Sequence, residues 1–444
     1  MRIRMSWRKT SCKDLTEYLL VILLLLEIKS VFSEAYYYDF HINEILCMVA
    51  ALYFASSTIS NMRLKGKCLF YILTYIAAAL VFMLISVSED RIVAYVCKFV
   101  LLIPLMFLLY VNETDLWYRI QIKMLRMTCV LAVGSLIMYI GGICLKIIPS
   151  MGTFTFFWGT VKKANVYGPF LFAEQQQEVF GIHIYRNVGI YTEGPIYGFI
   201  LVMALAVRLF LLKSSSKWDI IVLCLTIVST VSVTAMIFTV ILLLLNKFLD
   251  WKSEGKIGVV SRGGIVARRL AWIALIPIAG FLVYELYNFK LNTGLSYMKR
   301  MDDIKASITA FKTSPIWGVG YGNANTITEN YSSWRSASSG YSNGLFYILA
   351  TCGLVGLFFY LYCLVWGAVK SRSVTENCQW IIFCVLIGLL MVTVVSMQIY
   401  VLNYLALGMA FVCMHKSKAT EMSSGIARGK VDDGNIGMAV GGGV

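Results

Sequence analysis

Arg300 and the residues after it carry the clearest chemical signal in this chain of 444 residues. Residues 301–311 have the spacing of a short helix lying along a surface, and residues 315–322 read PIWGVGYG, with Gly318 and Gly320 among them. A guanidinium holds an anion through several fixed N–H donors, and glycine lets the backbone approach a ligand closely. The pattern favours capture of an anionic substrate held beside a bilayer.

The composition predicts that membrane helices position this segment. Hydrophobic residues make up 59% of the chain and charged residues only 14%, and the mean hydropathy is +0.74, which is too apolar for a water-soluble fold of this size. Ten apolar stretches come near the ~20 residues that cross a bilayer core. They are residues 15–32, 42–59, 68–87, 92–111, 124–148, 195–212, 270–287, 344–369, 380–395 and 400–414.

Residues 218–249 form an apolar stretch that is too long for one span. At ~1.5 Å per residue, a single helix of this length would overshoot the bilayer by roughly half. We therefore predict two short helices with a break near residues 229–232, STVS, where hydroxyl groups can bond the freed backbone. The result is an all-α polytopic membrane protein with about twelve spans.

The basic residues indicate which loops face the cytoplasm. They gather before the first apolar stretch, after the second, before the fifth, at residues 247–269 and after the last stretch. The net charge of +15 is then mainly a topology signal and an attraction to anionic lipids, and nucleic-acid binding is not expected.

This topology divides the chain into three regions. Residues 1–14 are expected to be a basic cytoplasmic N-terminus, residues 15–414 the membrane domain, and residues 415–444 a disordered cytoplasmic tail. Two long loops, residues 149–194 and 288–343, would face outward. Their many aromatic residues argue against disorder.

No metal or cofactor is expected. None of the twelve cysteines lies in either outer loop, and most lie in apolar stretches, so we interpret them as packing residues. No cysteine or histidine group has metal-ligand spacing, since His41, His183 and His415 are far apart. The glycine run at 318–322 lacks the flanking signature of a nucleotide-binding loop.

Three segments together resemble the Wzy-type O-antigen polymerase and O-antigen ligase superfamily of bacterial polysaccharide assembly. The first is residues 186–195, RNVGIYTEGP, at the entry to a span. The second runs from Arg300 through the expected helix to Pro315, Gly318 and Gly320, and the third is residues 342–357, at the re-entry into the membrane. Their order, spacing and sidedness are similar to those of the family.

One departure from the family pattern favours a polymerase. Ligases of the superfamily typically carry a histidine where this chain has Ser342 before Asn343, and no histidine lies between His183 and His415. Ligase-type transfer of finished polysaccharide to another acceptor therefore stays the alternative. A flippase or transporter is a second alternative, opposed by the few charges in the apolar stretches; Glu27, Lys29 and Lys98 are each interpreted as snorkelling near a helix end.

The resemblance implies an enzyme of the bacterial cytoplasmic membrane that joins polyprenyl-diphosphate-linked oligosaccharides on the outer face, without a cofactor. A flippase and a chain-length regulator would be its pathway partners. Because the lipid diphosphate leaves, fixed cations aimed at the phosphates would lower the barrier. Arg186 and Arg300, one from each outer loop, are the catalytic candidates, since a guanidinium binds phosphate through two donors. Alternatively, both arginines anchor the protein at lipid headgroups.

Other residues of the outer loops receive weaker assignments. Glu193 is either the base for the attacking hydroxyl or a carboxylate at the start of the sixth span, before Pro195. Lys299 and Arg335 are interpreted as headgroup anchors, and Asp302 and Asp303 as favourable charges at a helix start. The apolar stripe of the expected helix lies in the interface or in the core and consists of Ile304, Ile308 and Phe311. The expected substrate-binding residues are Trp317, Gly318, Gly320, Tyr321 and Asn343.

Overall fold

The computed structural model describes thirteen stretches of the chain, most of them helical. They are residues 12–35, 42–58, 66–113, 115–158, 160–168, 170–173, 176–179, 182–212, 217–254, 295–335, 341–374, 378–393 and 395–414. The expected span at 270–287 and the two predicted terminal regions, except residues 12–14, lie outside the described residues.

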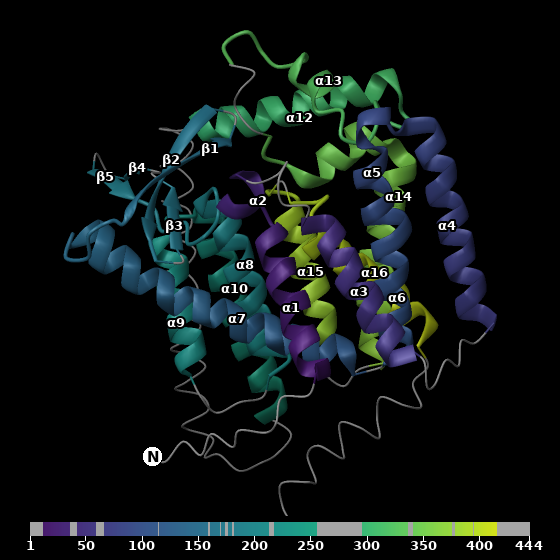
Figure 1. Cartoon of the computed structure of the whole chain (residues 1–444), viewed down its shortest axis with the longest axis horizontal. Helices are drawn as coiled ribbons and strands as arrows, with labels where there is room; N and C mark the ends of the chain where they lie inside the picture. The colour runs from purple at the N-terminus through teal and green to yellow at the C-terminus, as the bar shows by residue number, and fades with distance from the viewer. Residues whose placement is uncertain are drawn as a thin grey trace, which may run out of the picture.

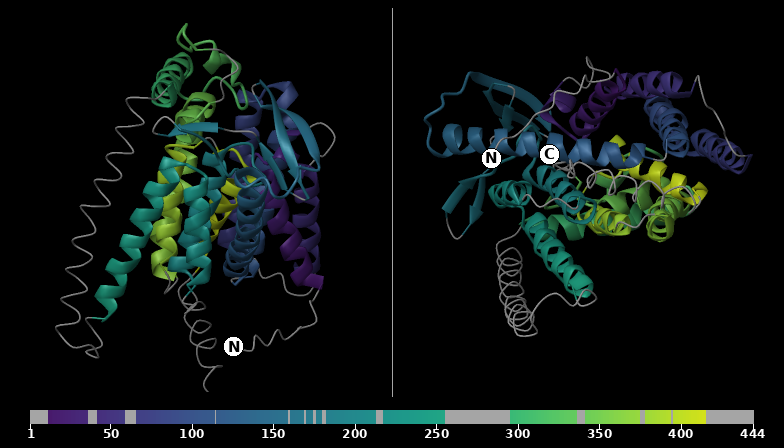
Figure 2. Two further views of the ribbon diagram at one scale, coloured as in Figure 1. Left: turned by 90° about the vertical axis from the view of Figure 1, so that its left-hand side faces the viewer. Right: turned by 90° about the horizontal axis from the view of Figure 1, so that it is seen from below.

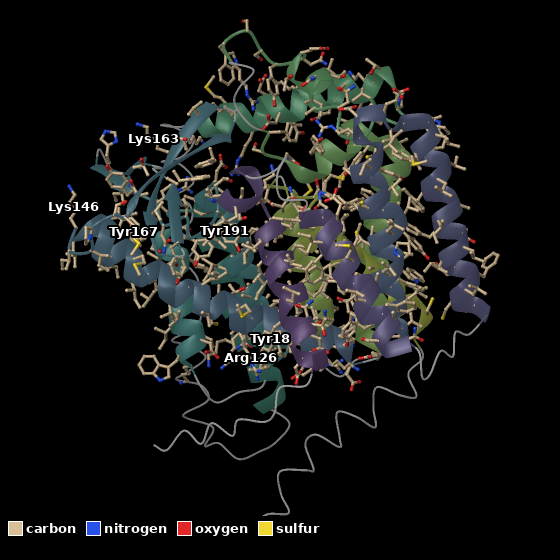
Figure 3. The ribbon with its side chains drawn as sticks, in the orientation of Figure 1. Tyr18, Arg126, Lys146, Lys163, Tyr167 and Tyr191 are labelled. Carbon is tan, nitrogen blue, oxygen red and sulfur yellow. The ribbon has the colours of Figure 1, made fainter. Side chains whose placement is uncertain are left out.

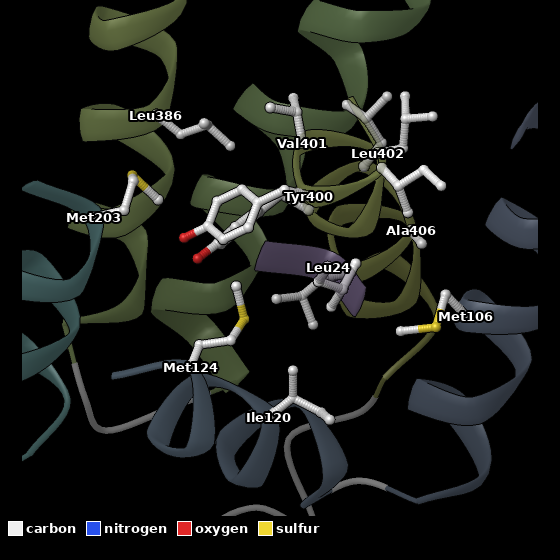
Figure 4. Packing of buried hydrophobic residues seen from close by; sticks show 14 of the residues in the cluster. Leu24, Met106, Ile120, Met124, Met203, Leu386, Tyr400, Val401, Leu402 and Ala406 are labelled. Carbon is white, nitrogen blue, oxygen red and sulfur yellow. The ribbon is translucent and has the colours of Figure 1, made fainter. Parts of the chain in front are cut away.

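A bundle of apolar helices forms the body of the molecule (Figure 1). Its central helices are α1 (Cys12–Glu27), α6 (Ile103–Asn112), α7 (Leu116–Met138), α8 (Gly194–Phe210), α15 (Gln379–Leu390) and α16 (Ile399–Cys413). In Figure 4, Tyr400 of α16 lies among Leu24 of α1 and Met124 of α7. Tyr400 is only 3% exposed, so this interior is closely packed around α16.

The remaining helices surround this centre. They are α2 (Val31–Ala35), α3 (Ile42–Thr58), α4 (Gly66–Ser86), η1 (Glu89–Arg91), α5 (Ile92–Tyr95), the π-helical η2 (Val96–Leu102), the π-helical η3 (Tyr139–Cys144), α9 (Trp218–Ser229), α10 (Val233–Glu254) and α14 (Gly344–Val374). Two more, α12 (Leu295–Thr313) and α13 (Asn325–Thr328), lie across one end of the bundle (Figure 1). We call this end the loop end.

The helix lengths and exposed side chains suggest a membrane protein. Within the described residues, four helical stretches are long and apolar enough to cross a bilayer: Gly66–Ser86, Glu89–Asn112, Leu116–Cys144 and Gly344–Arg372. Several others are apolar but shorter. On α4, Phe70 and Leu84 are 71% and 82% exposed, which suits contact with lipid better than contact with water. The twelve spans predicted from the sequence are not established by these helices.

The predicted break in residues 218–249 is confirmed. Helix α9 ends at Ser229, a turn follows, and α10 starts at Val233. Val231 has a φ of 51°, which a β-branched residue rarely adopts. The hydroxyl of Ser229 donates to the carbonyl of Thr226 and that of Thr230 to Ile227, each at 2.7 Å. These local bonds support the end of α9, as the sequence predicted.

The fold is mostly helical, as expected, but it is not all-α, because the first outer loop contains two small antiparallel sheets. One has the order β1-β2-β3, and the other pairs β4 with β5. The strands are β1 (Gly152–Trp158), β2 (Thr160–Tyr167), β3 (Phe170–Ala173), β4 (Gln176–Val179) and β5 (Ile182–Tyr185). The alternation of threonine and phenylalanine in residues 153–156 is the period of a strand, and it was overlooked within a long loop. Figure 2 shows these strands at the edge of the bundle.

Glu27 and Lys98 form a buried ion pair, so the snorkelling interpretation of these residues is wrong. Lys98 Nζ lies 3.1 Å from Glu27 Oε1, and the two side chains are 11% and 6% exposed. Glu27 also accepts a bond from the backbone N–H of Ile399 at 2.7 Å, and Lys98 donates to the carbonyl of Met397 at 3.2 Å. The pair therefore fixes the start of α16 against α1 and η2.

We predict that substituting one partner of this pair destabilises the protein more than replacing both partners with apolar residues. Glu27→Leu leaves the Lys98 ammonium buried without its carboxylate and should cost about 3–5 kcal/mol. The double variant Glu27→Leu/Lys98→Met, which carries no unpaired charge, should recover part of that loss. Thermal unfolding of the purified protein in detergent measures both. Equal loss in the single and double variants would contradict an electrostatic origin.

Candidate functional site

Arg335 anchors the second outer loop from within. Its side chain is 0% exposed, and Nη1 lies 2.6 Å from Asp303 Oδ1 and 3.5 Å from Asp302 Oδ2. The same nitrogen donates to the carbonyl of Lys299 at 2.9 Å, and the guanidinium lies 3.8 Å from the ring centre of Tyr331. The interpretation of Arg335 as a headgroup anchor is therefore wrong.

Asp302 and Asp303 are also placed differently from the expectation. Helix α12 starts at Leu295, about two turns before them, so they are not charges at a helix start. Asp302 accepts bonds from the backbone N–H and hydroxyl of Ser332, and Asp303 accepts the same two bonds from Ser342. The two carboxylates thus tie α12 to the loop before α14.

The buried face of α12 is the opposite of its apolar stripe. Ala306, Ser307 and Ala310 are at most 1% exposed and pack toward the loop and α14. Ile308 is 37% exposed, and Ile304 and Phe311 are partly exposed. Of the two locations expected for the stripe, the core is excluded, because small residues and paired carboxylates already fill the contact.

Arg300 is largely buried near the start of α12. Its Nε atom is buried and has no hydrogen-bond partner in the described part of the chain. Burial lowers the pKa of Arg300, while the charge of Asp303 opposes the shift. A guanidinium with an unsatisfied buried donor is suited to receive an anionic ligand.

Arg186 lies at the entry to α8 and contacts the turn between α9 and α10. Its Nε donates to the carbonyl of Thr230 at 2.8 Å, and Nη2 lies 3.4 Å from the carbonyl of Val231. Burial lowers the pKa of Arg186 to about 10, Glu193 opposes the shift, and the nearby charge of Arg300 adds to it. The two arginines of the separate outer loops thus come within electrostatic reach of each other.

The backbone around Arg186 is held by segments distant in sequence. The N–H of Asn187 donates to the carbonyl of Ser229 at 2.9 Å, and the N–H of Thr192 donates to the carbonyl of Lys29 at 3.1 Å. Tyr191, labelled in Figure 3, is fully buried there and forms a β-bridge with Ser30. The position of Arg186 is therefore determined by residues 29–30, which follow α1, by the end of α9 and by the turn after it.

Glu193 occupies the N-cap position of α8, with extended backbone angles and Pro195 in the first turn. Its carbonyl accepts the N–H groups of Ile196 and Tyr197, but its carboxylate does not cap the helix. Instead, Oε1 lies 3.9 Å from Nζ of Lys162, on strand β2. Glu193 thus lies at the start of the helix, as the second of its two expected roles requires, although its carboxylate pairs with Lys162. Its action as a base stays a prediction.

Lys162 was not selected from the sequence. Burial lowers its pKa, the charge of Glu193 opposes the shift and that of Lys299 adds to it. Charge interactions thus link Lys162 with Glu193 and Lys299, and Arg186 with Glu193 and Arg300. We call these five residues the cation cluster. The sequence of β2, TVKKANVY, does not alternate between apolar and polar residues, so Lys162 is recognisable only from the pairing of β2 with β1.

Gly318 and Gly320 support a broken helix. Helix α14 has non-helical angles at Gly353, and the backbone of residues 315–320 bonds to the helix there. The N–H groups of Val319 and Gly320 donate to the carbonyls of Ala350 and Thr351 at 2.9 and 3.1 Å. Gly318 has a φ of 77°, and a Cβ atom there would lie 2.4 Å from the carbonyl carbon of Thr351. The sequence predicted that these glycines let the backbone approach a ligand closely. In the structure, they let it approach helix α14.

Three further expected substrate-binding residues also have contacts within the protein. Tyr321 is 6% exposed and packs edge-on against Tyr95 and Phe99, so it is not available for stacking on a sugar. Trp317 is partly buried against Phe82. Asn343 precedes α14, and its side-chain oxygen accepts the N–H of Phe346 at 3.3 Å. Contact of Trp317 or Asn343 with substrate stays a prediction.

No protein-family model, curated protein or solved structure is significantly similar to this chain.

The glycine contact can be tested with two substitutions in one loop. Gly318 and Gly322 share a φ of 77°, so alanine brings the same backbone strain, of about 1–2 kcal/mol, to both. At Gly318 the new methyl meets the backbone of α14, whereas at Gly322 the nearest atom is Cγ of Arg91, 3.2 Å away on a flexible side chain. Gly318→Ala should therefore lower the unfolding temperature much further than Gly322→Ala. Equal shifts would show that the fit to α14 is unimportant.

Proposed function

We propose that this protein polymerises polysaccharide by joining polyprenyl-diphosphate-linked oligosaccharide units. The reaction would occur at the outer face of the bacterial cytoplasmic membrane, with the loop end facing outward and both termini in the cytoplasm. It would need no cofactor or nucleotide. The proposal follows from the resemblance of residues 186–195, 300–320 and 342–357 to the polymerase and ligase superfamily.

The electrostatic interaction between Arg186 and Arg300 is the observation that supports this function best. These arginines come from the two long loops on which the resemblance depends, and each is buried enough to lower its pKa. Two like charges close together in a half-buried site are unfavourable unless an anion neutralises them. The diphosphate of a lipid carrier supplies that anion.

In the proposed reaction, the oxygen of the acceptor hydroxyl bonds to the anomeric carbon of the donor sugar. The bond from that carbon to the phosphate oxygen breaks, and its electron pair stays on the diphosphate. Arg186 and Arg300 stabilise the negative charge that grows there, and this lowers the barrier. The hydroxyl proton passes to Glu193, whose carboxylate is one-third exposed and interacts with the charge of Arg186.

Ser342 supports polymerase activity over ligase activity. At the position where ligases of the superfamily carry a histidine, this serine donates its N–H and hydroxyl to the carboxylate of Asp303. The side chain is thus engaged in holding α12. A transporter is disfavoured because Glu27 and Lys98 bind each other and backbone groups, leaving them unsuited to guide a polar cargo.

We predict that loss of this protein leaves single repeat units on the carrier lipid or on the final acceptor. Analysis of the accumulated saccharides in a deletion strain measures this. Full-length polymer that remains attached to the carrier would instead indicate a ligase. Repeat units trapped on the cytoplasmic face would indicate a flippase.

We also predict that the arginines act through their shape as well as their charge. Arg300→Lys and Arg186→Lys keep the positive charge but lose the planar fork, and each should raise the barrier by about 2–4 kcal/mol. The measurement is the rate of polymer formation at matched protein level in the membrane. Normal polymer from both lysine variants would leave the arginines as interfacial anchors.

Two controls accompany the arginine variants. Lys305→Ala removes an exposed cation from the same helix as Arg300 and should leave polymer formation unchanged. Thermal unfolding separates a folding defect from a catalytic one. This matters most for Arg186, because its Nε also bonds the carbonyl of Thr230.

A further inference from the structure

Lys162 points from strand β2 toward the body of the protein. Its partner across the β1–β2 ladder is Phe156, which is 4% exposed, and Ala164 on the same face is 0% exposed. Residues directly opposite each other in a ladder share one face, and neighbours along a strand alternate. Lys163 accordingly faces away from the bundle and is exposed, as Figure 3 shows. The strand thus carries one inward and one outward lysine in succession.

The inward direction brings Lys162 to the cation cluster. Lys299 and Arg300 lie in the second turn of α12, whose start overlaps one end of the β1–β2 hairpin in the view of Figure 1. Lys162 Nζ is 3.9 Å from Glu193 Oε1, and Lys299 is close enough to lower the pKa of Lys162. Three separate parts of the chain, namely β2, the entry to α8 and the start of α12, therefore supply charges to one place.

The cluster has more positive than negative charge. Lys162, Arg186, Lys299 and Arg300 contribute four positive charges and Glu193 one negative charge, which leaves an excess of three. Asp303, the carboxylate near Arg300, is already 2.6 Å from Arg335. Partial burial makes such an excess unfavourable in the absence of a further anion. A ligand with two adjacent negative groups neutralises this excess of positive charge better than a single carboxylate does.

We propose that Lys162 is a third phosphate-binding residue of the site, and that the carboxylate of Glu193 holds its ammonium in place until a diphosphate takes over that contact. This proposal rests on the proposed function, because it concerns the same substrate. Binding moves no proton in this exchange: Lys162 changes partner from carboxylate to phosphate. Glu193 is then released from its cation at the moment when substrate is present.

The sheet explains how a lysine can act in this way. A lysine side chain is flexible, so its charge is placed well only if its backbone is fixed. The ladder of β1 with β2 runs from Gly152 opposite Val166 to Trp158 opposite Thr160, with Lys162 near the hairpin end. Strand pairing therefore sets both the position of Lys162 along the sheet and the face of the sheet on which its side chain lies. This gives the unexpected sheet of the first outer loop a role in the site.

The test is direct binding of farnesyl diphosphate to the full-length protein in lipid nanodiscs. Lys162→Ala should weaken binding by at least tenfold, whereas Lys163→Ala, on the opposite face of the same strand, should leave it unchanged. Glu193→Gln should strengthen binding, because it removes the competing carboxylate. Farnesol, which has the same tail without phosphate, should bind all variants equally. Lys162→Arg should restore part of the affinity, and thermal unfolding confirms that each variant is folded.

The outcomes separate this inference from the proposed function. If Lys162→Ala binds farnesyl diphosphate as well as the unaltered protein while Arg300→Ala binds it poorly, Lys162 is no phosphate-binding residue, although the proposed function survives. If neither variant changes binding, both proposals fail. If Lys162→Ala weakens retention of phosphatidylglycerol and leaves farnesyl diphosphate binding unchanged, the anion is an ordinary lipid headgroup and the inference is wrong. Competition by inorganic pyrophosphate in the unaltered protein, reduced in Lys162→Ala, would support it.

Discussion

The buried ion pair between Arg335 and Asp303 is the interaction on which the arrangement of the loop end depends. A charge pair removed from water is stable only when its remaining donors and acceptors are also satisfied. Here Asp303 additionally binds Ser342, and Arg335 binds the carbonyl of Lys299 and lies over Tyr331. The pair therefore holds the middle of α12, the end of the second outer loop and the entry to α14 together. Arg300 directly follows Lys299, whose carbonyl accepts a hydrogen bond from Arg335.

Backbone hydrogen bonding at the loop end is completed by contacts between segments that are distant in sequence. A helix interrupted in an apolar environment leaves carbonyl and N–H groups without partners, and these must be satisfied from elsewhere. The break in α14 at Gly353 is filled by residues 315–320, and the turn between α9 and α10 is bonded by Arg186 and Asn187. The same residues that complete these helix ends therefore also fix the two outer loops.

The cation cluster combines this rigidity with an excess of positive charge. Binding sites for phosphate work best when the donors are held in place before the ligand arrives, because little reorganisation is then needed. Arg186 is fixed by the carbonyl of Thr230, Arg300 by the packing of α12, and Lys162 by strand pairing. Glu193, at the N-cap of α8, is the carboxylate among them. Such a site suits transfer from a diphosphate leaving group, which is the reaction we propose.

The sequence by itself determined the apolar helices and one break in detail. Helix periodicity and hydropathy are local properties, so the split between Ser229 and Val233 and the existence of a helix after Arg300 were predictable. The sheet of residues 152–173 was also visible in principle, as the alternation of threonine and phenylalanine. The sequence selected Arg186, Glu193 and Arg300 as separate candidates, but it contained no information on the distances among them.

Only the tertiary structure decided which polar residues support the fold and which gather at one site. Arg335 and Arg300 are both arginines of the second outer loop, yet Arg335 is enclosed by carboxylates, whereas the buried Nε of Arg300 has no partner among the described residues. Gly318 is determined by the backbone of α14, and Lys162 becomes relevant because β2 turns it toward Glu193. These roles depend on contacts between residues far apart in the chain, and local composition does not encode such contacts because burial and charge pairing arise only after the helices and strands have packed.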